Sequence, residues 1–483
     1  MKRVLLGFDI GTLSSKGVLV DLEGTVLAEA GIAHEIIREA SGWAEHRPRE
    51  DYWEKFVAIV GMLLDRSGVD PHDIGAIGVD GLVPTMLPVD GNGEALRNAV
   101  LYLDNRAVGQ LEEANGILSE PISLEQVVPK MMWFRDHEPE LYEKTAGFTL
   151  PHSYVVEKLT GARVIDVDTA NAYGGIFDPD SGVWKPGVME RLGLDPARMP
   201  QARPATDIAG RTGDRAAKAG LPAGIPVIVG TGDSFSSLLG YGVIHKGDMM
   251  IYLGTAGTQI MCKKELEKVA DTIHVSDKGR AVEFRANMIA CGQALEWFRK
   301  EVAGGVSYDD LNREAALLNP GSEKLITLPH FMGIRTPMPD PLACGTLFGL
   351  TLNHGHPHMY RSLIEGITYG MKEGMDSIAS QVKRVVVTGG GSRSALWCQI
   401  LSDCLNRPVE VPSGGGAALG IAYLAGRSVG VFDGFTALEE KWVTIGQRFS
   451  PDPENHARYE AFYRMYLELN GQLAARYRPL YEL

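Results

Sequence analysis

Asp9 interrupts an apolar run near the start of the chain, in "VLLGFDIGTLSSKGVLV". A buried carboxylate without a partner is costly or shifts its pKa, so this position calls for a partner or a ligand. In the turn that follows, Gly11 lets the chain reverse, Thr12 and Ser14 offer hydroxyl and N–H groups to an anion, and Lys16 adds positive charge. Magnesium is commonly held by one or two carboxylates together with phosphate oxygens. The stretch therefore predicts a phosphate-binding turn with a metal-binding carboxylate beside it.

Two further turns bear on this interpretation. Taken alone, the first turn fits a plain hairpin better, with its hydroxyls and charged groups bonded locally. A second hairpin in "LGTAGT", with Thr255 and Thr258, changes this, because two like hairpins could hold a phosphate chain from both sides. The loop "TGGGSRS" ends an apolar strand and begins a helix, which suits close approach of backbone N–H groups to a nucleotide. Its simpler interpretation is a tight turn in which Ser392 or Ser394 caps the helix.

Hydrophobic patterning predicts the elements that would position these turns. The first 35 residues alternate as three short strands separated by glycine turns, which indicates an antiparallel meander. A helix in "PREDYWEKFVAIVGMLLDRSG" and a buried strand in "IGAIGVDG" follow. The second half repeats this order, with a hairpin at 247–262 and a strand, glycine loop and helix at 382–405. The chain therefore shows a weak internal duplication.

No long linker separates the two halves. We therefore expect two domains, residues 1–245 and 246–483, that face each other across a cleft. Near the end of the chain, "ENHARYEAFYRMYLELNGQLAARY" predicts a terminal helix that packs on a domain, with Tyr459, Phe462 and Tyr466 facing inward.

Composition limits the class of protein. The 483 residues are 45% hydrophobic and 22% charged, which is enough for two or three cores. A net charge of -14 disfavours a nucleic-acid-binding surface and favours small-molecule partners. The five cysteines form no CxxC pair, which indicates reduced thiols, and no run of about 20 apolar residues offers a membrane span. A cytoplasmic protein is expected.

Several common catalytic motifs are missing from the sequence. It contains no Gly-Lys dipeptide, so it has no Walker A loop, and neither HRD nor DFG occurs. "GRSVG" matches GxSxG around Ser428, but an alanine-rich helix precedes it where a hydrolase elbow requires a strand. These absences disfavour P-loop, protein-kinase and hydrolase chemistry.

Five motifs together resemble the FGGY family of carbohydrate kinases. In order, they are "DIGTLSSK", "GTGDSFSSLLG", "YLGTAGT", "GTLFGLTLNHGHPHMYRSLIEG" and "VVTGGGSRSALWCQILSDCLNRPVEV". The likeness covers nearly the whole chain and is strongest to xylulokinase-type members. It implies an α/β fold of two actin-like ATPase domains of ribonuclease-H-like topology. It also implies ATP and Mg²⁺ at the site, and a sugar or polyol that receives the γ-phosphate.

The resemblance carries family roles onto particular positions. It implies metal binding by Asp9 and Asp233. The residues it implies for nucleotide binding are Gly11, Thr12, Leu13, Ser14, Lys16, Gly254, Thr255, Thr258, Gly389, Gly390, Gly391 and Ser392.

Asp233 falls where the family has its catalytic base. Phosphoryl transfer needs the acceptor hydroxyl aligned and its proton removed, while the metal and backbone amides neutralise charge on the transferring group. Asp233 also precedes "SFSSLLGY", where it would make a good helix N-cap. The two roles are compatible.

The acceptor side departs from the family pattern. Xylulokinases and glycerol kinases have polar residues after the strand equivalent to "AIGVDG", whereas this chain has the sequence "LVPT" from Leu82 to Thr85. Asp80, Asp104 and Arg106 are the residues that could still bind the substrate, although the last two could instead form a structural ion pair. D-Xylulose is accordingly expected to be a poor substrate.

Two classes of function remain open from the sequence. The first is an ATP-dependent kinase of a ketopentose or related sugar, with Asp233 as general base. The second is a nucleotide-driven conformational switch of the actin and heat-shock-protein type, which has no small acceptor. The partners expected are a sugar and ATP, without nucleic acid or membrane, and a homodimer is left open.

Overall fold

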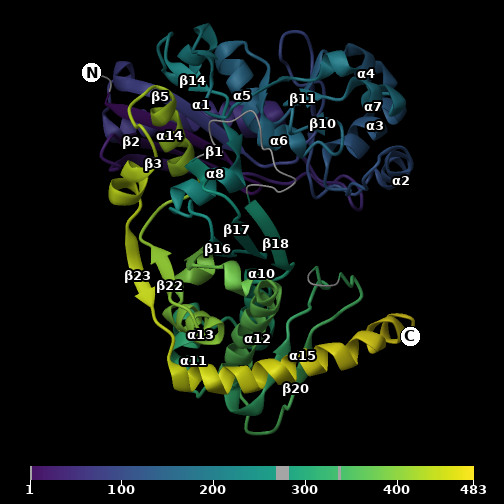
Figure 1. Ribbon diagram of the computed structural model, residues 1–483, viewed down its shortest axis with the longest axis vertical. Helices are drawn as coiled ribbons and strands as arrows, with labels where there is room; N and C mark the ends of the chain where they lie inside the picture. Colours follow the sequence, from purple (N-terminus) through teal and green to yellow (C-terminus); the bar gives the residue numbers. More distant parts are fainter. Residues whose placement is uncertain (1–2, 268–281, 336–338) are drawn as a thin grey trace. The chain divides into compact units, whose positions relative to one another are not determined.

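The computed structural model describes residues 3–267, 282–335 and 339–483 (Figure 1). The described chain forms two compact units. Unit 1 comprises residues 3–244, 265–267 and 414–444, and unit 2 comprises residues 245–264, 282–335, 339–413 and 445–483. The chain first passes from unit 1 to unit 2 after Ile244, and the segment 414–444 returns to unit 1. The two contiguous domains expected from the sequence stay a prediction.

Unit 1 is built on one mixed sheet. Its strand order is β13-β14-β5-β1-β2-β3, and β15 also pairs with β5. The strands are β1 (Val4–Ile10), β2 (Ser14–Asp21), β3 (Val26–Ala33), β5 (Ile74–Gly81), β13 (Ile208–Arg211), β14 (Pro226–Ile228) and β15 (Thr231–Gly232). The expected antiparallel meander is present as β1, β2 and β3. Because β5 runs parallel to β1 and to β15, the carboxyl ends of these three strands lie at one edge.

Helices cover both faces of this sheet (Figure 1). Phe8 and Gly17 are register partners, and they meet Phe56 and Ile59 of α1 (Lys55–Ser67) on one face. On the other face, α14 (Ala417–Ser428) packs against β1 and β5, and α8 (Asp233–Gly240) packs against α14.

The close approach of α14 requires glycine in the sheet. A Cβ atom at Gly7 would lie 1.9 Å from the carbonyl oxygen of Ala418, and one at Gly78 would lie 2.4 Å from that of Ile421. Gly7 and Gly78 are register partners in β1 and β5. No other residue type fits there without moving α14 away from the sheet.

The rest of unit 1 includes a second apolar core around Trp133, Phe134 and Phe148. Its remaining helices are α2 (Val108–Ile117), α3 (Val127–His137), α4 (Pro139–Lys144), α6 (Val167–Asn171), α7 (Pro186–Arg191) and α5 (Pro151–Thr160), of which α5 packs against β5 in the core of the main sheet. Its short strand pairs are β4 (Glu45–His46) with β7 (Ala99–Val100), β6 (Leu87–Val89) with β8 (Gly147–Thr149), β9 (Val164–Asp166) with β12 (Gln201–Arg203), and β10 (Phe177–Asp178) with β11 (Val183–Trp184).

Unit 2 is built on a six-stranded sheet of order β18-β17-β16-β21-β22-β23. The strands are β16 (Asp248–Leu253), β17 (Gly257–Cys262), β18 (Val282–Met288), β21 (Arg384–Thr388), β22 (Val409–Pro412) and β23 (Ile445–Phe449). Antiparallel β16 and β17 form a hairpin, and β21 runs parallel to β16. Unit 1 has the same arrangement, an antiparallel hairpin beside a parallel strand, as expected from the internal duplication.

Helices pack around the sheet of unit 2 (Figure 1). They are α10 (Gly292–Trp297), α11 (Tyr308–Ala316), α12 (His356–Asp376), α13 (Ala395–Leu405) and the C-terminal α15 (Pro453–Tyr481), and a small hairpin pairs β19 (Ile326–Leu328) with β20 (Thr346–Phe348). As expected, Tyr459 and Tyr466 of α15 are fully buried, and Phe462 packs at the margin of the same core. In the described parts of the chain, no helix is both long and apolar enough to cross a membrane.

Candidate active site

Three carboxylates come together in unit 1 at the carboxyl ends of parallel strands. Asp9 on β1 and Asp80 on β5 are register partners, so their side chains lie on the same face of the sheet. Thr231 of β15 is the partner of Asp80 on the other side, and Asp233 follows two residues later as the first residue of α8. This edge is where open α/β sheets bind their ligands.

Burial sets the charge of this cluster. It raises the pKa of Asp233 to about 7, with the nearby negative charge of Asp9 adding to the effect. It also raises the pKa of Asp9 to about 6, although contact with Asp80 and the positive charge of Lys16 oppose this. The pKa of Asp80 lies well above the usual range, because Asp80 is fully buried beside Asp9. Burial therefore makes all three carboxyl groups harder to ionise than an ordinary aspartate, since the pKa of each is raised.

Asp233 lies one position further into its helix than the sequence suggested. Gly232 occupies the N-cap position of α8 and Asp233 is the first helical residue. Its Oδ1 accepts a hydrogen bond of 3.3 Å from the hydroxyl of Ser234. The backbone N–H of Ser234 also favours the ionised carboxylate, which thus stays at the positive end of the helix dipole.

The cluster fits a cation whose other ligands come from outside the protein. Oδ1 of Asp9 is buried and has no hydrogen-bond partner among the described residues. The carboxyl group of Asp80 interacts with Asp9 and Ser236, but neither of its oxygens forms a hydrogen bond of ordinary geometry within the described chain. In the same residues, no group of three acidic, histidine or cysteine side chains could hold a metal ion by itself. One or two carboxylates with phosphate and water oxygens is the usual magnesium arrangement.

The first predicted phosphate turn is the exposed tip of the β1–β2 hairpin. The N–H of Gly11 donates to the carbonyl of Ser14 over 3.0 Å and closes the turn. Leu13 at the tip is 57% exposed, and the hydroxyl of Thr12 lies 3.4 Å from that of Tyr102. Lys16 on β2 is the register partner of Asp9. The hairpin thus places its hydroxyls and Lys16 next to the strand that carries the carboxylate.

In unit 2, the second hairpin and the glycine loop are neighbours. The strands β16 and β21, which lead into them, pair as far as Tyr252 and Thr388. Gly389 adopts a φ of +88°, and a Cβ atom there would lie 2.7 Å from the carbonyl oxygen of Leu253. The carbonyl of Gly254 accepts from the N–H of Gly292 over 2.8 Å, so the start of α10 supports this hairpin.

The serines of the glycine loop have distinct roles. The hydroxyl of Ser394 caps α13, because it accepts from the N–H of Trp397 over 3.2 Å. The hydroxyl of Ser392 donates to the carbonyl of Gly389 over 2.8 Å and holds the loop closed. Of the two caps considered from the sequence, Ser394 is thus the one used. Thr258 lies within β17, opposite Tyr252, one position beyond the turn.

Asp104 and Arg106 form a buried ion pair. The two oxygens of Asp104 accept from Nε and Nη2 of Arg106 over 2.8 and 2.7 Å. The guanidinium also lies 2.7 Å from the carboxylate of Glu45 and 3.6 Å from the centre of the Trp43 ring. These contacts satisfy Asp104 internally. Arg106 keeps one buried nitrogen, Nη1, without a partner in the described residues. A substrate role for the pair stays a prediction.

Two contacts around Asp233 were not anticipated from the sequence. Oδ1 of Asp166 accepts from the hydroxyl of Thr231 over 3.1 Å, and His152 lies 3.6 Å from the other oxygen of Asp166. Val83 lies close enough that a Cβ atom at Gly232 would come within 2.8 Å of its Cγ2 atom. The only sequence signal for Asp166 is its position before the short helix α6, whose Thr169 N–H it caps.

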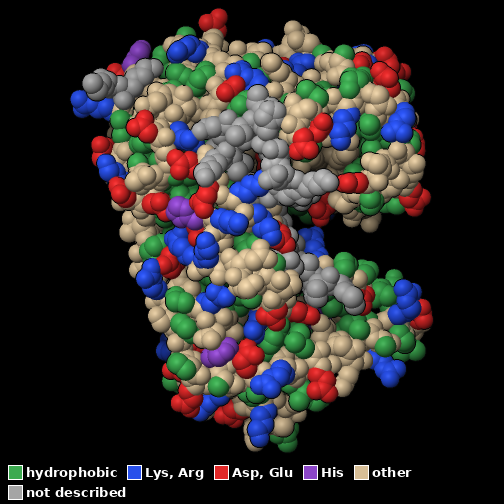
Figure 2. Space-filling view, in the orientation of Figure 1, with side chains coloured by type: hydrophobic (Ala, Val, Ile, Leu, Met, Phe, Trp, Pro, Cys, Tyr) green, Lys and Arg blue, Asp and Glu red, His purple; other side chains and the backbone are tan. Residues whose placement is uncertain are grey.

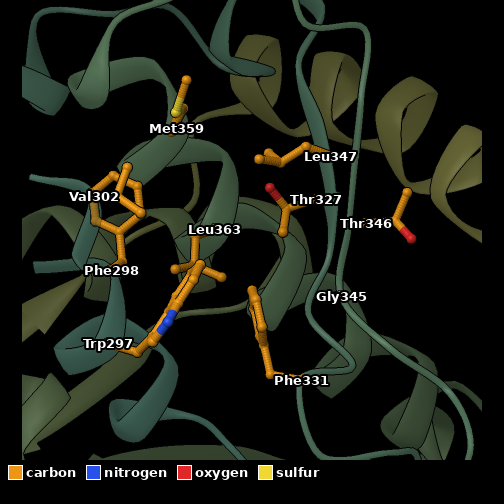
Figure 3. Close-up of a pocket in the computed structure, with 10 residues that line it drawn as sticks. All are labelled: Trp297, Phe298, Val302, Thr327, Phe331, Gly345, Thr346, Leu347, Met359 and Leu363. Carbon is orange, nitrogen blue, oxygen red and sulfur yellow. The ribbon is translucent and has the colours of Figure 1, made fainter.

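An apolar pocket of about 180 Å³ in unit 2 is a different kind of site (Figure 3). The rings of Trp297 and Phe331 lie 5.0 Å apart at this pocket. The hydroxyl of Thr327 is already bonded to that of Ser362 over 2.7 Å. None of the residues predicted to bind the nucleotide lines the pocket. Its walls have the chemistry of a hydrophobic surface and do not suit a triphosphate.

The surface carries charges of both signs. Lysine and arginine side chains intermix with aspartate and glutamate over the face shown in Figure 2. The net charge of the whole chain is -14.

Comparison with protein families gives two matches in sequence order. The N-terminal domain of the FGGY family of carbohydrate kinases matches residues 4–240, and its C-terminal domain matches residues 249–429. Together they cover most of the chain.

Individual relatives extend over the same length. A xylulose kinase of Bacillus subtilis (strain 168) is 28% identical over 481 residues, 96% of each chain. A gluconokinase of Bacillus licheniformis is 26% identical over 517 residues, 99% of this chain and 98% of its own. The crystal structure of xylulose kinase from Rhodospirillum rubrum has a TM-score of 0.85 at 28% identity and covers 99% of this chain and 100% of its own. These likenesses confirm the expected α/β fold with two actin-like ATPase domains.

Proposed function

Because the chain belongs to the FGGY family of carbohydrate kinases, we propose that this sugar kinase phosphorylates a ketopentose or a related sugar, with Asp233 as general base. ATP is the co-substrate of the family, and the enzyme is an ATP:sugar phosphotransferase. Family membership sets aside a nucleotide-driven switch without a small acceptor. What we propose beyond this family activity is the class of sugar, the use of a metal and the roles of individual residues.

The observation that supports Asp233 is its position together with its pKa. It lies at the carboxyl edge of the parallel strands, near Asp9, and burial raises its pKa to about 7. A general base works best when its pKa is close to the working pH. A carboxylate with this pKa can take the proton of the acceptor hydroxyl as the oxygen attacks the γ-phosphate.

The remaining residues of the site would bind and neutralise ATP. We assign the phosphates to the two hairpins, through Thr12 and Thr255, and the adenosine to the loop at Gly389–Gly391. Magnesium, when bound, would neutralise charge on the phosphates. Asp9 is the residue suited to hold it, because its buried Oδ1 has no other partner in the described chain.

The acceptor side of the proposed site includes the largely apolar segment Leu82–Thr85. Val83 lies against Gly232, the residue before Asp233. Valine offers no hydrogen bond, so a sugar hydroxyl that faced it would lose its bonds to water without replacement. We therefore expect D-xylulose to be a poor substrate and a related sugar with fewer hydroxyls at this position to be preferred. Asp80 is retained as a proposed contact to the acceptor.

A coupled assay of ADP formation across pentuloses, hexuloses, tetritols, glycerol and gluconate tests this function. The expected result is ADP formation that depends on one class of sugar. Slow ATP hydrolysis that no sugar accelerates would contradict the proposal. A kcat/KM for D-xylulose of about 10⁴ M⁻¹s⁻¹ or more, an ordinary value for an enzyme on its own substrate, would contradict the expected substrate preference.

A further inference from the structure

A chain of polar side chains lies behind the first phosphate hairpin, within unit 1. Oδ1 of Asp51 accepts from Nζ of Lys55 over 2.7 Å. Nζ of Lys55 lies 2.8 Å from Nδ1 of His34. Nε2 of His34 lies 3.0 Å from the hydroxyl of Ser15, and His34, Asp51 and Ser15 are all buried. The chain therefore runs without a break from the short helical segment Pro48–Glu54 to the second residue of β2.

The chemistry of these groups fixes the direction of each hydrogen bond. An ammonium group only donates, so Nδ1 of His34 must accept from Lys55. Burial and the neighbouring charge of Lys55 lower the pKa of His34 to about 3, so its ring is neutral and carries a single proton. That proton must be on Nε2, which therefore donates to the hydroxyl oxygen of Ser15.

His34 also holds the turn through its backbone. Its N–H donates to the carbonyl of Leu13 over 2.8 Å, at the tip of the hairpin. Ser15 is the register partner of Ile10, the last residue of β1. The turn from Gly11 to Ser14 is therefore anchored to one residue, His34, both at its tip and just beyond its end.

A second histidine faces the same turn. Nδ1 of His46 lies 3.2 Å from the buried hydroxyl of Tyr52, and its ring lies 5.3 Å from that of His34. Its ring interacts with the backbone of Thr12, while its Nε2 atom is buried without a hydrogen-bond partner of ordinary geometry in the described residues. His34 is thus the histidine whose backbone and ring both form hydrogen bonds to the hairpin, and the inference concerns this residue.

We propose that His34 is a positioning residue for ATP: by donating from Nε2 to Ser15 and from its backbone to Leu13, it fixes the turn whose hydroxyl and N–H groups meet the phosphates. This rests on the proposed role of the hairpin in phosphate binding. Small displacements of binding groups reduce the benefit of a preformed site. Loss of the Ser15 bond should therefore weaken nucleotide binding more than sugar binding.

A purely structural role would give a different pattern. Buried, fully bonded polar networks stabilise a fold, and breaking one lowers the free energy of unfolding. In that case, variants would lose thermal stability but would bind nucleotide as the wild type does. Nucleotide affinity, measured together with the melting temperature, separates the two roles.

Two pairs of variants test the proposal. Ser15→Ala removes the acceptor of the histidine bond, and Ser15→Thr retains a hydroxyl at that position. In His34→Gln, the side-chain amide nitrogen takes the place of Nε2 and can still donate a hydrogen bond to Ser15. In His34→Asn, the shorter side chain extends only to the position of Nδ1, so it can keep the hydrogen bond from Lys55 but not the one to Ser15. Ser153→Ala is the matched control, because Ser153 is equally buried and its hydroxyl has no partner among the described residues.

The measurements are the Kd of MgADP by calorimetry, the KM values for ATP and for the sugar, and the melting temperature. Ser15→Ala and His34→Asn are expected to weaken MgADP binding and raise the KM for ATP about three- to tenfold, at unchanged sugar KM, an effect of one hydrogen bond. Ser15→Thr, His34→Gln and Ser153→Ala should stay within about twofold of the wild type, less than one such bond.

Two outcomes would overturn the proposal. One is a loss of thermal stability in Ser15→Ala and His34→Asn with unchanged MgADP affinity. The other is an equal loss of affinity in His34→Gln and His34→Asn, since only one of these keeps the donor to Ser15. A wild-type enzyme that binds no MgADP would instead contradict the proposed function itself, and the inference with it.

Discussion

At the scale of single residues, the environment of Asp233 determines what the site can do. A carboxyl with an ordinary pKa would be a weak base at neutral pH. Burial beside Asp9 raises the pKa of Asp233 to about 7 and makes it suitable for proton removal. In the ligand-free protein, an ionised Asp233 lowers the free energy of unfolding, because a buried carboxylate near another carboxylate is unfavourable. The same residue therefore allows a test of catalysis and a test of stability.

The catalytic test is Asp233→Asn. Asparagine keeps the size of the side chain at the start of α8 but cannot accept the proton, so kcat should fall about 10² to 10⁴-fold, the usual contribution of a general base. Binding of ATP and of sugar should change little. The measurement is kcat at saturating ATP and sugar, together with a thermal melt that confirms folding. Near-normal turnover would remove Asp233 from the mechanism.

The stability test concerns pH. In the unfolded chain Asp233 has a pKa near the ordinary value of about 3.9, whereas in the folded protein its pKa is raised to about 7. Between these values the folded state binds more protons than the unfolded state, so the free energy of unfolding falls as the pH rises, by at most about 1.4 kcal/mol per pH unit. Asp233→Asn removes this loss.

Thermal melts of the ligand-free protein from pH 5 to pH 8 measure this effect. The advantage of Asp233→Asn over the wild type should grow as the pH rises toward 7 and level off above it. Asp65→Asn, at an exposed position of α1, is the control and should run parallel to the wild type. A difference that stays constant over this range would show that Asp233 titrates normally.

At the scale of elements, the two hairpins are the units that we expect to bind the phosphates. The hydroxyls of Thr12 and Thr255 lie at the turns of β1–β2 and β16–β17. Thr12→Val and Thr255→Val each remove a hydroxyl without changing shape, so each should raise the KM for ATP severalfold and leave the KM for sugar nearly constant. Thr25→Val, in the exposed β2–β3 turn, is the control. Equal changes in both KM values would contradict phosphate binding by the hairpins.

The contact between α14 and the sheet is a second test at this scale. A Cβ atom at Gly7 would lie 1.9 Å from the carbonyl oxygen of Ala418, so Gly7→Ala forces the helix away from the strand that carries Asp9. Overpacking of this kind typically costs about 1 to 3 kcal/mol. Chemical denaturation should show this loss. Gly61→Ala in α1, where a Cβ atom meets nothing within 4 Å, should leave the protein as stable or make it more stable.

At the scale of the whole molecule, the features of the fold that could be predicted from the sequence are those that depend on local motifs. The two hairpins, one in each unit, the meander of unit 1 and the glycine loop of unit 2 all follow from short stretches in which turn residues interrupt apolar runs. The return of residues 414–444 to unit 1 could not be predicted in this way. It depends on α14 fitting against Gly7 and Gly78, which lie hundreds of residues away in sequence, and no local pattern identifies the partner of a glycine.

The candidate site was predictable to a similar extent. Asp9 stood out because it interrupts an apolar run, and Asp233 because it falls where the family has its catalytic base; the structure brings them together with Asp80 at one edge of the sheet. The bond from Asp166 to Thr231 and the contact of Val83 with Gly232 were missed. Both depend on segments separated by at least 65 residues, which only the folded chain brings into contact.

A final prediction addresses whether both units bind one nucleotide. The residues proposed for ATP lie in unit 1, at Gly11–Lys16, and in unit 2, at Gly254–Thr258 and Gly389–Ser392. Hydrogen exchange followed by mass spectrometry, with and without MgADP, reports protection at each segment separately. If one nucleotide engages both hairpins, all three segments should become protected over the same range of MgADP concentrations, while the β2–β3 turn around Gly24 should not change. Protection confined to unit 2 would show that the nucleotide binds through the second hairpin and the glycine loop alone, and the first hairpin would then need another role.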